Sequence, residues 1–239
     1  MKKPVTLYIL LLALSIGVLF LLNLFLGSVD IPFRSIWNIL WGMDEGESVI
    51  WQNIIWKSRV PQALTAMVAG AGLAVSGLQM QTVFRNPLAG PSVLGISSGA
   101  SLGVAFVVLL SGSIGGIALS RLGFMGEIAL TMAAIIGALS IMALIVYVSQ
   151  KVHGNVTLLI IGVMIGYVAN AVIGVLKFFS VEEDIRAYVI WGLGSFARVS
   201  GNQMMVFVCI MAVLLPLSFL LIKTLNLLLL GDAYARHLG

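Results

Sequence analysis

Residues 5–27 read VTLYILLLALSIGVLFLLNLFLG and contain no charged side chain. A helix needs about 20 mostly apolar residues to cross the hydrocarbon of a bilayer. The run is too long for a secretory signal peptide, whose apolar region has about 7–15 residues, and it lacks a clear cleavage site. We therefore predict that this segment is a retained transmembrane helix.

The rest of the chain repeats this character. Of its 239 residues, 60% are hydrophobic and only 9% are charged, whereas an average soluble domain carries roughly 25% charged residues. We predict an all-α, polytopic membrane protein that forms a single transmembrane domain over residues 1–239. Its six predicted spans are 5–27, 60–83, 92–111, 126–149, 156–179 and 203–222.

The connections between these spans also carry signals. Residues 28–58 include Trp37 and Trp41 within an amphipathic stretch, which predicts a short helix in the membrane interface. The Arg85-Asn86-Pro87 sequence ends the second span, because a proline disfavours helical geometry in the residue before it. Three consecutive acidic residues place 181–200 outside the hydrocarbon.

Small residues repeat at four-residue spacing on three predicted spans, which is typical of helices that pack closely in lipid. These positions are 66, 70 and 74, then 95, 99 and 103, and finally 162, 166, 170 and 174. Asn170 is the polar member of these stripes. A polar side chain inside a membrane faces a partner helix or a water-filled cavity, so Asn170 is a candidate path-lining residue.

Ionisable side chains are almost absent from the predicted spans, which limits the chemistry of this chain. We find no phosphate-binding glycine loop, no paired carboxylates and no metal-ligand spacing, so we expect no catalytic residue, no metal site and no enzyme. The net charge of +4 is scattered, which argues against nucleic acid as a partner. The lone Cys209 cannot form an internal disulfide.

Two other functions stay open at this level. An ion- or proton-coupled secondary transporter normally needs a carboxylate or histidine inside the membrane, and the predicted spans offer none near their centres. An intramembrane hydrolase would need a base near Ser97 or Ser98, and no histidine lies close to them in sequence. An active transporter of this composition would therefore take its energy from another chain.

Several motifs occur together in one order along the chain. Arg59-Val60-Pro61 is followed by VAGAGLAVSG at 68–77, NPLAGP at 86–91 and LGISSGA at 94–100. WGLGSF at 191–196 and GDAYARHLG at 231–239 follow later. In this order the sequence resembles the permease subunit of the type II ABC importer family for iron–siderophore, haem and vitamin B12.

This resemblance implies a whole assembly. The family fold has ten spanning helices, so the six predicted here would be the front portion of a truncated permease. The family works by alternating access as a homodimer in the bacterial cytoplasmic (inner) membrane, with cytoplasmic ATP-binding subunits and an extracytoplasmic substrate-binding protein. ATP and Mg would bind the partner ATPase, and this chain itself would bind no cofactor. The positive-inside rule does not decide orientation, but the resemblance puts the N-terminus in the cytoplasm.

The resemblance also implies roles for individual residues. Residues 227–239 match the coupling segment that docks on the ATPase, although an amphipathic tail on the membrane surface is the alternative. The coupling residues are Gly231, Asp232, Tyr234, Ala235, Leu238 and Gly239.

Two further sites follow from the same comparison of motifs. Arg59 matches a rim position that grips the binding protein. Gln62 stands where the family pattern has a second arginine, and Lys57 is the candidate that substitutes for it. Ordinary interfacial anchoring is the alternative. Gly154, Asn155 and Val156 are the predicted cytoplasmic gate: Asn155 aligns with a small polar position of the family gate, whereas Val156 departs toward an apolar residue. A plain turn is the alternative.

Overall fold

The computed structural model describes residues 3–43, 46, 48–114, 124–152 and 154–230, and every regular element in these ranges is helical. Five helical stretches among them are long and apolar enough to cross a membrane. They are Val5–Phe25, Val49–Phe84, Met125–Ser149, Asn155–Phe178 and Gly201–Phe219. The prediction of an all-α, polytopic membrane protein is therefore confirmed.

The third predicted span, 92–111, begins later than expected. Helix α5 covers Ile96–Ile114, and its described apolar part, Ile96–Leu110, is shorter than the other spans. The start predicted at residue 92 is wrong because Gly95 has a φ of 74°, in the left-handed region that glycine adopts without steric cost. The chain turns through Ser92 and Gly95 before it becomes helical.

The described chain divides into two compact units. Unit 1 contains Met1–Gly72 and Ser195–Leu220, and unit 2 contains Leu73–Gly194 and Leu221–Gly239. Helix α4 (Val60–Phe84) runs through the boundary, so its first part belongs to unit 1 and its last part to unit 2.

Unit 1 begins with α1 (Lys3–Phe25) and the amphipathic α2 (Phe33–Leu40), which confirms the short helix predicted around Trp37. Ile36 and Ile39 of α2 pack with Ile31 and Ile55 in a small core. Helix α3 (Val49–Ile54) continues through a π-helical turn, Ile55–Arg59, directly into α4. This insertion matters because π-helical turns are often found at functional sites.

The C-terminal part of unit 1 contains the short η3 helix (Phe196–Arg198) and α9 (Gly201–Phe219). A capping box explains the start of α9. The Ser200 hydroxyl accepts from the Gln203 backbone N–H at 3.4 Å, and the Gln203 side-chain oxygen accepts from the Ser200 N–H at 3.0 Å. The helix therefore begins slightly before the predicted residue 203.

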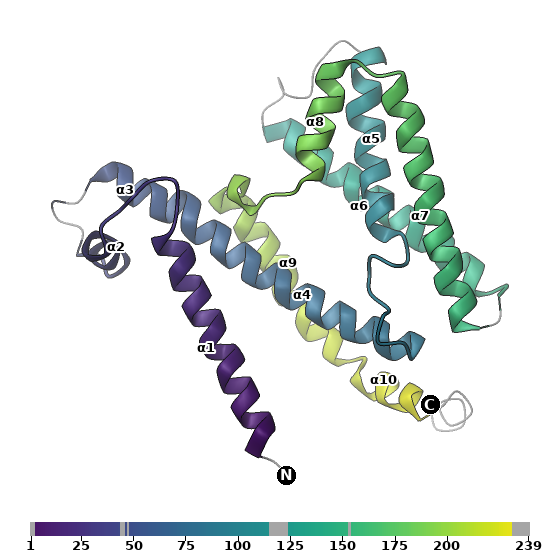
Figure 1. Cartoon of the computed structure of the whole chain (residues 1–239), viewed down its shortest axis with the longest axis horizontal. Coiled ribbons are helices and arrows are strands. Elements are labelled where there is room, and N and C mark those ends of the chain that lie inside the picture. Colours follow the sequence, from purple (N-terminus) through teal and green to yellow (C-terminus); the bar gives the residue numbers. More distant parts are fainter. Residues whose placement is uncertain (1–2, 44–45, 47, 115–123, 153, 231–239) are drawn as a thin grey trace. The chain divides into compact units, whose positions relative to one another are not determined.

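Unit 2 is built around α5, which packs against α6 (Phe124–Ser149), α7 (Asn155–Phe178) and α8 (Glu182–Gly192) (Figure 1). The glycine stripe on α5 allows this packing. A Cβ added at Gly99 would lie 2.7 Å from the carbonyl oxygen of Gly137, and one at Gly103 would collide with the Ala133 carbonyl. The close-packing prediction for residues 95, 99 and 103 is confirmed, whereas Gly70 and Gly174 face open space.

Helix α8 is an element that the sequence did not predict. The acidic residues Glu182, Glu183 and Asp184 form its first turn, where negative charge is favourable because the helix dipole is positive there. Tyr188 is buried in a cluster with Val104, Leu109 and other apolar residues. The segment is therefore a packed helix and not a simple connection. The short α10 (Ile222–Leu229) completes unit 2.

Candidate functional site

The start of α4 holds the two residues predicted to dock a binding protein, and the structure separates them. Lys57 is exposed on the π-helical turn. Arg59 is only 4% exposed. Its guanidinium donates hydrogen bonds to the backbone oxygens of Leu24 at 2.6 Å and Phe25 at 3.3 Å, and to that of Val29.

These bonds give Arg59 an internal structural role. The last carbonyls of α1 have no partner within their own helix, and the positive guanidinium also suits the negative end of the helix dipole. A side chain buried in this way is not presented on a rim, so the docking prediction for Arg59 does not fit the geometry. Lys57 stays a predicted docking residue.

The predicted gate lies between α6 and α7. Gly154 has a φ of 110°, which favours glycine, and it caps the start of α7. The Asn155 amide donates to the backbone oxygen of Val83 at 3.1 Å, across 72 positions of sequence. Val156 is 67% exposed. Turn formation explains Gly154, but the Asn155 contact is tertiary, so these residues join the gate region to the end of α4.

The end of α4 is a Schellman motif. The Asn86 N–H donates to the Gln81 carbonyl at 3.1 Å, and the Arg85 N–H donates to the Thr82 carbonyl at 3.3 Å. Pro87 follows, and its carbonyl accepts from the Gln81 side chain at 3.1 Å. The sequence therefore predicted the end of this helix correctly, and the hydrogen bonds show how it is made.

Arg85 also connects this helix end to α10. Its Nε and Nη2 atoms both donate to the backbone oxygen of Leu228, at 3.0 Å and 2.7 Å. Beneath this contact, Phe84 is buried in a cluster with Leu94, Ile145 and Leu159. The polar contacts at the end of α4 thus rest on a packed base formed by α6, α7 and the segment before α5.

The predicted coupling residues Gly231, Asp232, Tyr234, Ala235, Leu238 and Gly239 lie outside the described residues. Of the predicted coupling segment 227–239, the structure describes only the start, which forms the last turn of α10 and Leu230. Arg85 therefore contacts the described part of the predicted coupling segment directly.

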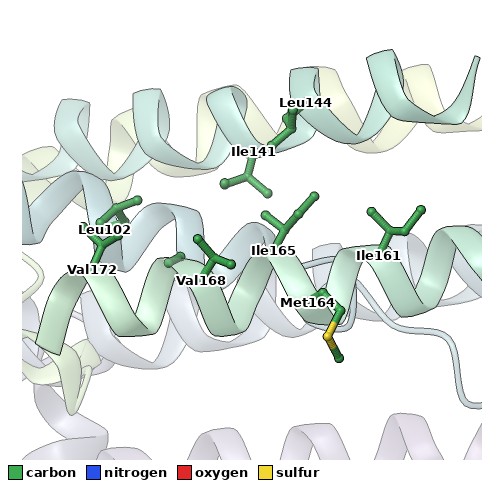
Figure 2. Close-up of a pocket in the computed structure, with 9 residues that line it drawn as sticks. Leu102, Ile141, Leu144, Ile161, Met164, Ile165, Val168 and Val172 are labelled. Atoms are coloured by element: carbon green, nitrogen blue, oxygen red, sulfur yellow. The ribbon is translucent and has the colours of Figure 1, made fainter. Parts of the chain in front are cut away.

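An open apolar groove of about 290 Å³ lies between α5, α6 and α7. Figure 2 shows the lining side chains, among them Leu102, Ile141 and Met164, around a space without polar groups. This lining suits an apolar group and offers nothing that would bind a polar one. Asn170 is exposed on α7 and is not part of the lining, so its role in a path stays a prediction.

Two pKa shifts are found on α8, which lies outside the candidate spans. Burial, and then the charge of Glu183, raise the pKa of Asp184. Burial also raises the pKa of Tyr188, although a hydrogen bond with Ser101 acts in the opposite direction. Among the described residues, no cluster of three or more His, Cys, Asp or Glu side chains is arranged to hold a metal ion.

Comparison with known proteins places these features in a family. The FecCD transport family matches residues 12–239. The chain belongs to this family. Within it, the chain is 35% identical over 215 residues to the hemin transport system permease protein HmuU of Yersinia pestis, a match that covers 90% of this chain and 60% of that protein.

Another relative and a solved structure agree with this membership. The chain is 36% identical to the vitamin B12 import system permease protein BtuC of Serratia proteamaculans, which covers 97% of this chain and 63% of that protein. A structure described as an inward-facing conformation of a metal-chelate type ABC transporter has a TM-score of 0.74 and 27% identity, and the match covers 95% of this chain and 66% of that one. The chain therefore spans less than two thirds of the length of these relatives.

The sequence did not single out Arg85 as a functional residue. It was interpreted only as part of the signal that ends the second span. The one available signal was its rarity, because charged residues make up only 9% of this FecCD-family chain and Arg85 directly follows an apolar helix. Its partner, the carbonyl of Leu228, is 143 positions away and carries no side-chain signature.

Proposed function

We propose that this FecCD-family chain is the membrane permease of an ATP-driven importer for a metal chelate such as haem, cobalamin or an iron–siderophore. The observation that carries the proposal is the family match over residues 12–239. The names of the two relatives, a hemin and a vitamin B12 permease, support the same class of cargo. The solved neighbour is a transporter of metal-chelate type.

The assembly follows from this class. Two copies of the permease enclose a path that opens alternately to each side of the cytoplasmic membrane. ATP-binding subunits, which hold ATP and Mg, bind on the cytoplasmic side, where the N-terminus also lies. A binding protein delivers the chelate from outside. The scarcity of ionisable residues in the spans supports an external energy source, because a proton- or ion-coupled path uses such residues.

Individual residues take parts in this scheme. Gly231, Asp232, Tyr234, Ala235, Leu238 and Gly239 contact the ATPase, and Lys57 contributes to the outer rim that meets the binding protein. Rim charges act mainly on orientation and association rate. Gly154, Asn155 and Val156 form the cytoplasmic gate, and Asn170 lines the path.

The class of energy source is tested by uptake in cells that express the full-length gene with its ATPase and binding protein. Radiolabelled haem, cobalamin and a ferric siderophore are supplied in parallel. We expect uptake of one cargo to stop when ATP is depleted at constant membrane potential, and to persist when a protonophore collapses the proton gradient while ATP is maintained. Uptake that follows the proton gradient and ignores ATP would instead establish a secondary transporter.

A further inference from the structure

The contact between Arg85 and Leu228 joins two helix ends. Leu228 lies in the last turn of α10, and its carbonyl also accepts a backbone N–H at the C-terminal cap of that helix. Two nitrogen atoms of one guanidinium donate to its oxygen, at 3.0 Å and 2.7 Å. A positively charged guanidinium that donates through two nitrogen atoms at the negative end of a helix dipole is a favourable arrangement.

The backbone at Arg85 is unusual. Its φ is 49°, and among the described residues other than glycine it is the one with a positive φ. It occupies the position of the Schellman motif that is usually glycine, because a Cβ is unfavourable in the left-handed conformation. Glycine would fit this left-handed backbone conformation with less strain. We therefore attribute the arginine to the contact that its side chain makes.

The same turn of α4 also contacts the gate region. The Val83 carbonyl accepts the hydrogen bond from Asn155, the first residue of α7. Phe84, between Val83 and Arg85, is anchored in the apolar cluster with Ile145 and Leu159. The last turn of α4 therefore touches α10 through Arg85 and α7 through Val83, on a base that resists deformation because packed interiors have low compressibility.

We propose that Arg85 is a positioning residue that transmits movement of the coupling segment to the gate, through the last turn of α4. The inference rests on the proposed function. When the ATPase displaces the coupling segment, the end of α4 moves together with the end of α10, because Arg85 is bound to Leu228. The Val83–Asn155 hydrogen bond then transmits this displacement to the start of α7. Arg85 touches neither cargo nor nucleotide in this role.

The chemistry of arginine suits such a link. A guanidinium holds several donors in one rigid plane, whereas a lysine ammonium is a point charge on a flexible stem. Lysine would keep the electrostatic attraction to the helix end but could not donate two hydrogen bonds from a rigid plane to the Leu228 carbonyl. We therefore expect Arg85→Lys to transmit movement less efficiently than the native residue and better than a residue without charge.

The test uses the full-length permease with its ATPase and binding protein in proteoliposomes that enclose ATP. Cargo uptake and ATP hydrolysis are measured together, and the melting temperature of the complex is recorded. The decisive variant is Arg85→Gly, because glycine is favoured at this backbone position and the turn should still fold. Lys223→Gln is the matched control, since it removes an exposed cation from the same helix, α10.

We expect Arg85→Gly to lower the amount of cargo moved per ATP by up to about fivefold, because an exposed charged contact contributes at most about 1 kcal/mol. ATP hydrolysis and melting temperature stay close to those of the native complex. Arg85→Lys gives an intermediate ratio, and Lys223→Gln gives the native ratio.

Other outcomes overturn the inference in distinguishable ways. A native ratio for Arg85→Gly would show that the link transmits nothing. A fall in uptake that only accompanies loss of melting temperature and of ATP hydrolysis, in both Arg85→Gly and Arg85→Lys, would assign Arg85 a structural role. If the native complex shows no ATP-driven uptake, the proposed function fails, and the inference fails with it.

Discussion

Helix α4 carries an arginine at each end, and the two side chains use similar chemistry in different surroundings. Arg59, directly before the helix, donates to carbonyls at the end of α1, and Arg85, directly after it, donates to a carbonyl at the end of α10. Arg59 is 4% exposed, whereas Arg85 is exposed. The same guanidinium–carbonyl contact can therefore stabilise the fold at one end of α4 and transmit movement at the other.

Burial makes this difference. A buried charge that loses its partners has no water to replace them, so breaking the Arg59 contacts is costly. An exposed guanidinium can exchange its carbonyl for water at little cost. We therefore expect substitutions at the first junction to change stability and substitutions at the second to change function.

The largest effect is expected for Arg59→Gln. The variant leaves backbone oxygens of Leu24 and Phe25 without their charged donor, and we expect the unfolding free energy to fall by about 3 kcal/mol or more. Thermal unfolding in lipid nanodiscs measures it. Lys57→Gln, a neighbouring exposed cation, should stay within about 0.5 kcal/mol of the native protein. Equal losses in both variants would remove the distinction between anchor and surface charge.

A smaller effect is expected at Gly27, which sharpens the evidence for a tightly packed anchor. A Cβ at this position would lie 2.6 Å from the Arg59 Nη2 atom, so we expect Gly27→Ala to cost about 1–2 kcal/mol. Gly17→Ala in α1 meets nothing within 4 Å and should be neutral or stabilising by about 0.5–1 kcal/mol, because alanine is the better helix former. Nanodisc melting curves of both variants compare them directly; a neutral Gly27→Ala would mean that Arg59 is loosely held.

At the other end of α4, Arg85→Gly should barely change stability. The loss of an exposed hydrogen bond costs roughly 0–1 kcal/mol, and relief of the left-handed backbone returns about 1 kcal/mol. We expect a net change within about 0.5 kcal/mol in the same unfolding assay. A loss of stability as large as that of Arg59→Gln would show that both arginines stabilise the fold, and the proposed difference between them would be wrong.

The smallest effect is expected away from both junctions, at Asp184. Its raised pKa means that the folded state favours the protonated form. The stabilisation is present below the ordinary pKa of 3.8 and is lost as pH rises through the raised value. Asp184→Asn should therefore remove a shallow fall in stability above pH 3.8, and change the unfolding free energy at neutral pH by no more than about 0.5 kcal/mol. A steeper pH dependence in the variant would contradict this sign.

Much of the fold could be predicted because lipid imposes a simple rule on sequence. Long apolar runs predicted the spans, and the stripe at residues 95, 99 and 103 predicted close helix packing without naming a partner. In the structure Gly99 and Gly103 pack on α6, and Gly95 packs on Gly162 and Gly166 of α7. Helix α8 was missed because its acidic first turn indicated a connection outside the membrane, while the burial of Tyr188 depends on α5. Local signals alone do not show such packing.

The candidate site was less predictable because its contacts are made to backbone atoms far away in sequence. Arg59 was interpreted as a rim charge because of the family resemblance, and nothing near it in the sequence indicates that it turns inward to the end of α1. Arg85 and Asn155 likewise meet carbonyls 143 and 72 positions away. A carbonyl leaves no trace in the sequence, and only the folded chain shows which one is used.

ATP-driven import is tested most directly by reconstitution of the purified full-length permease, its ATPase and its binding protein in sealed proteoliposomes. Cargo accumulation is measured with ATP enclosed, with a non-hydrolysable analogue enclosed, and with an imposed proton gradient but no nucleotide. We predict accumulation only with hydrolysable ATP. Accumulation with the proton gradient alone, or equal accumulation with the analogue, would contradict an ATP-driven importer.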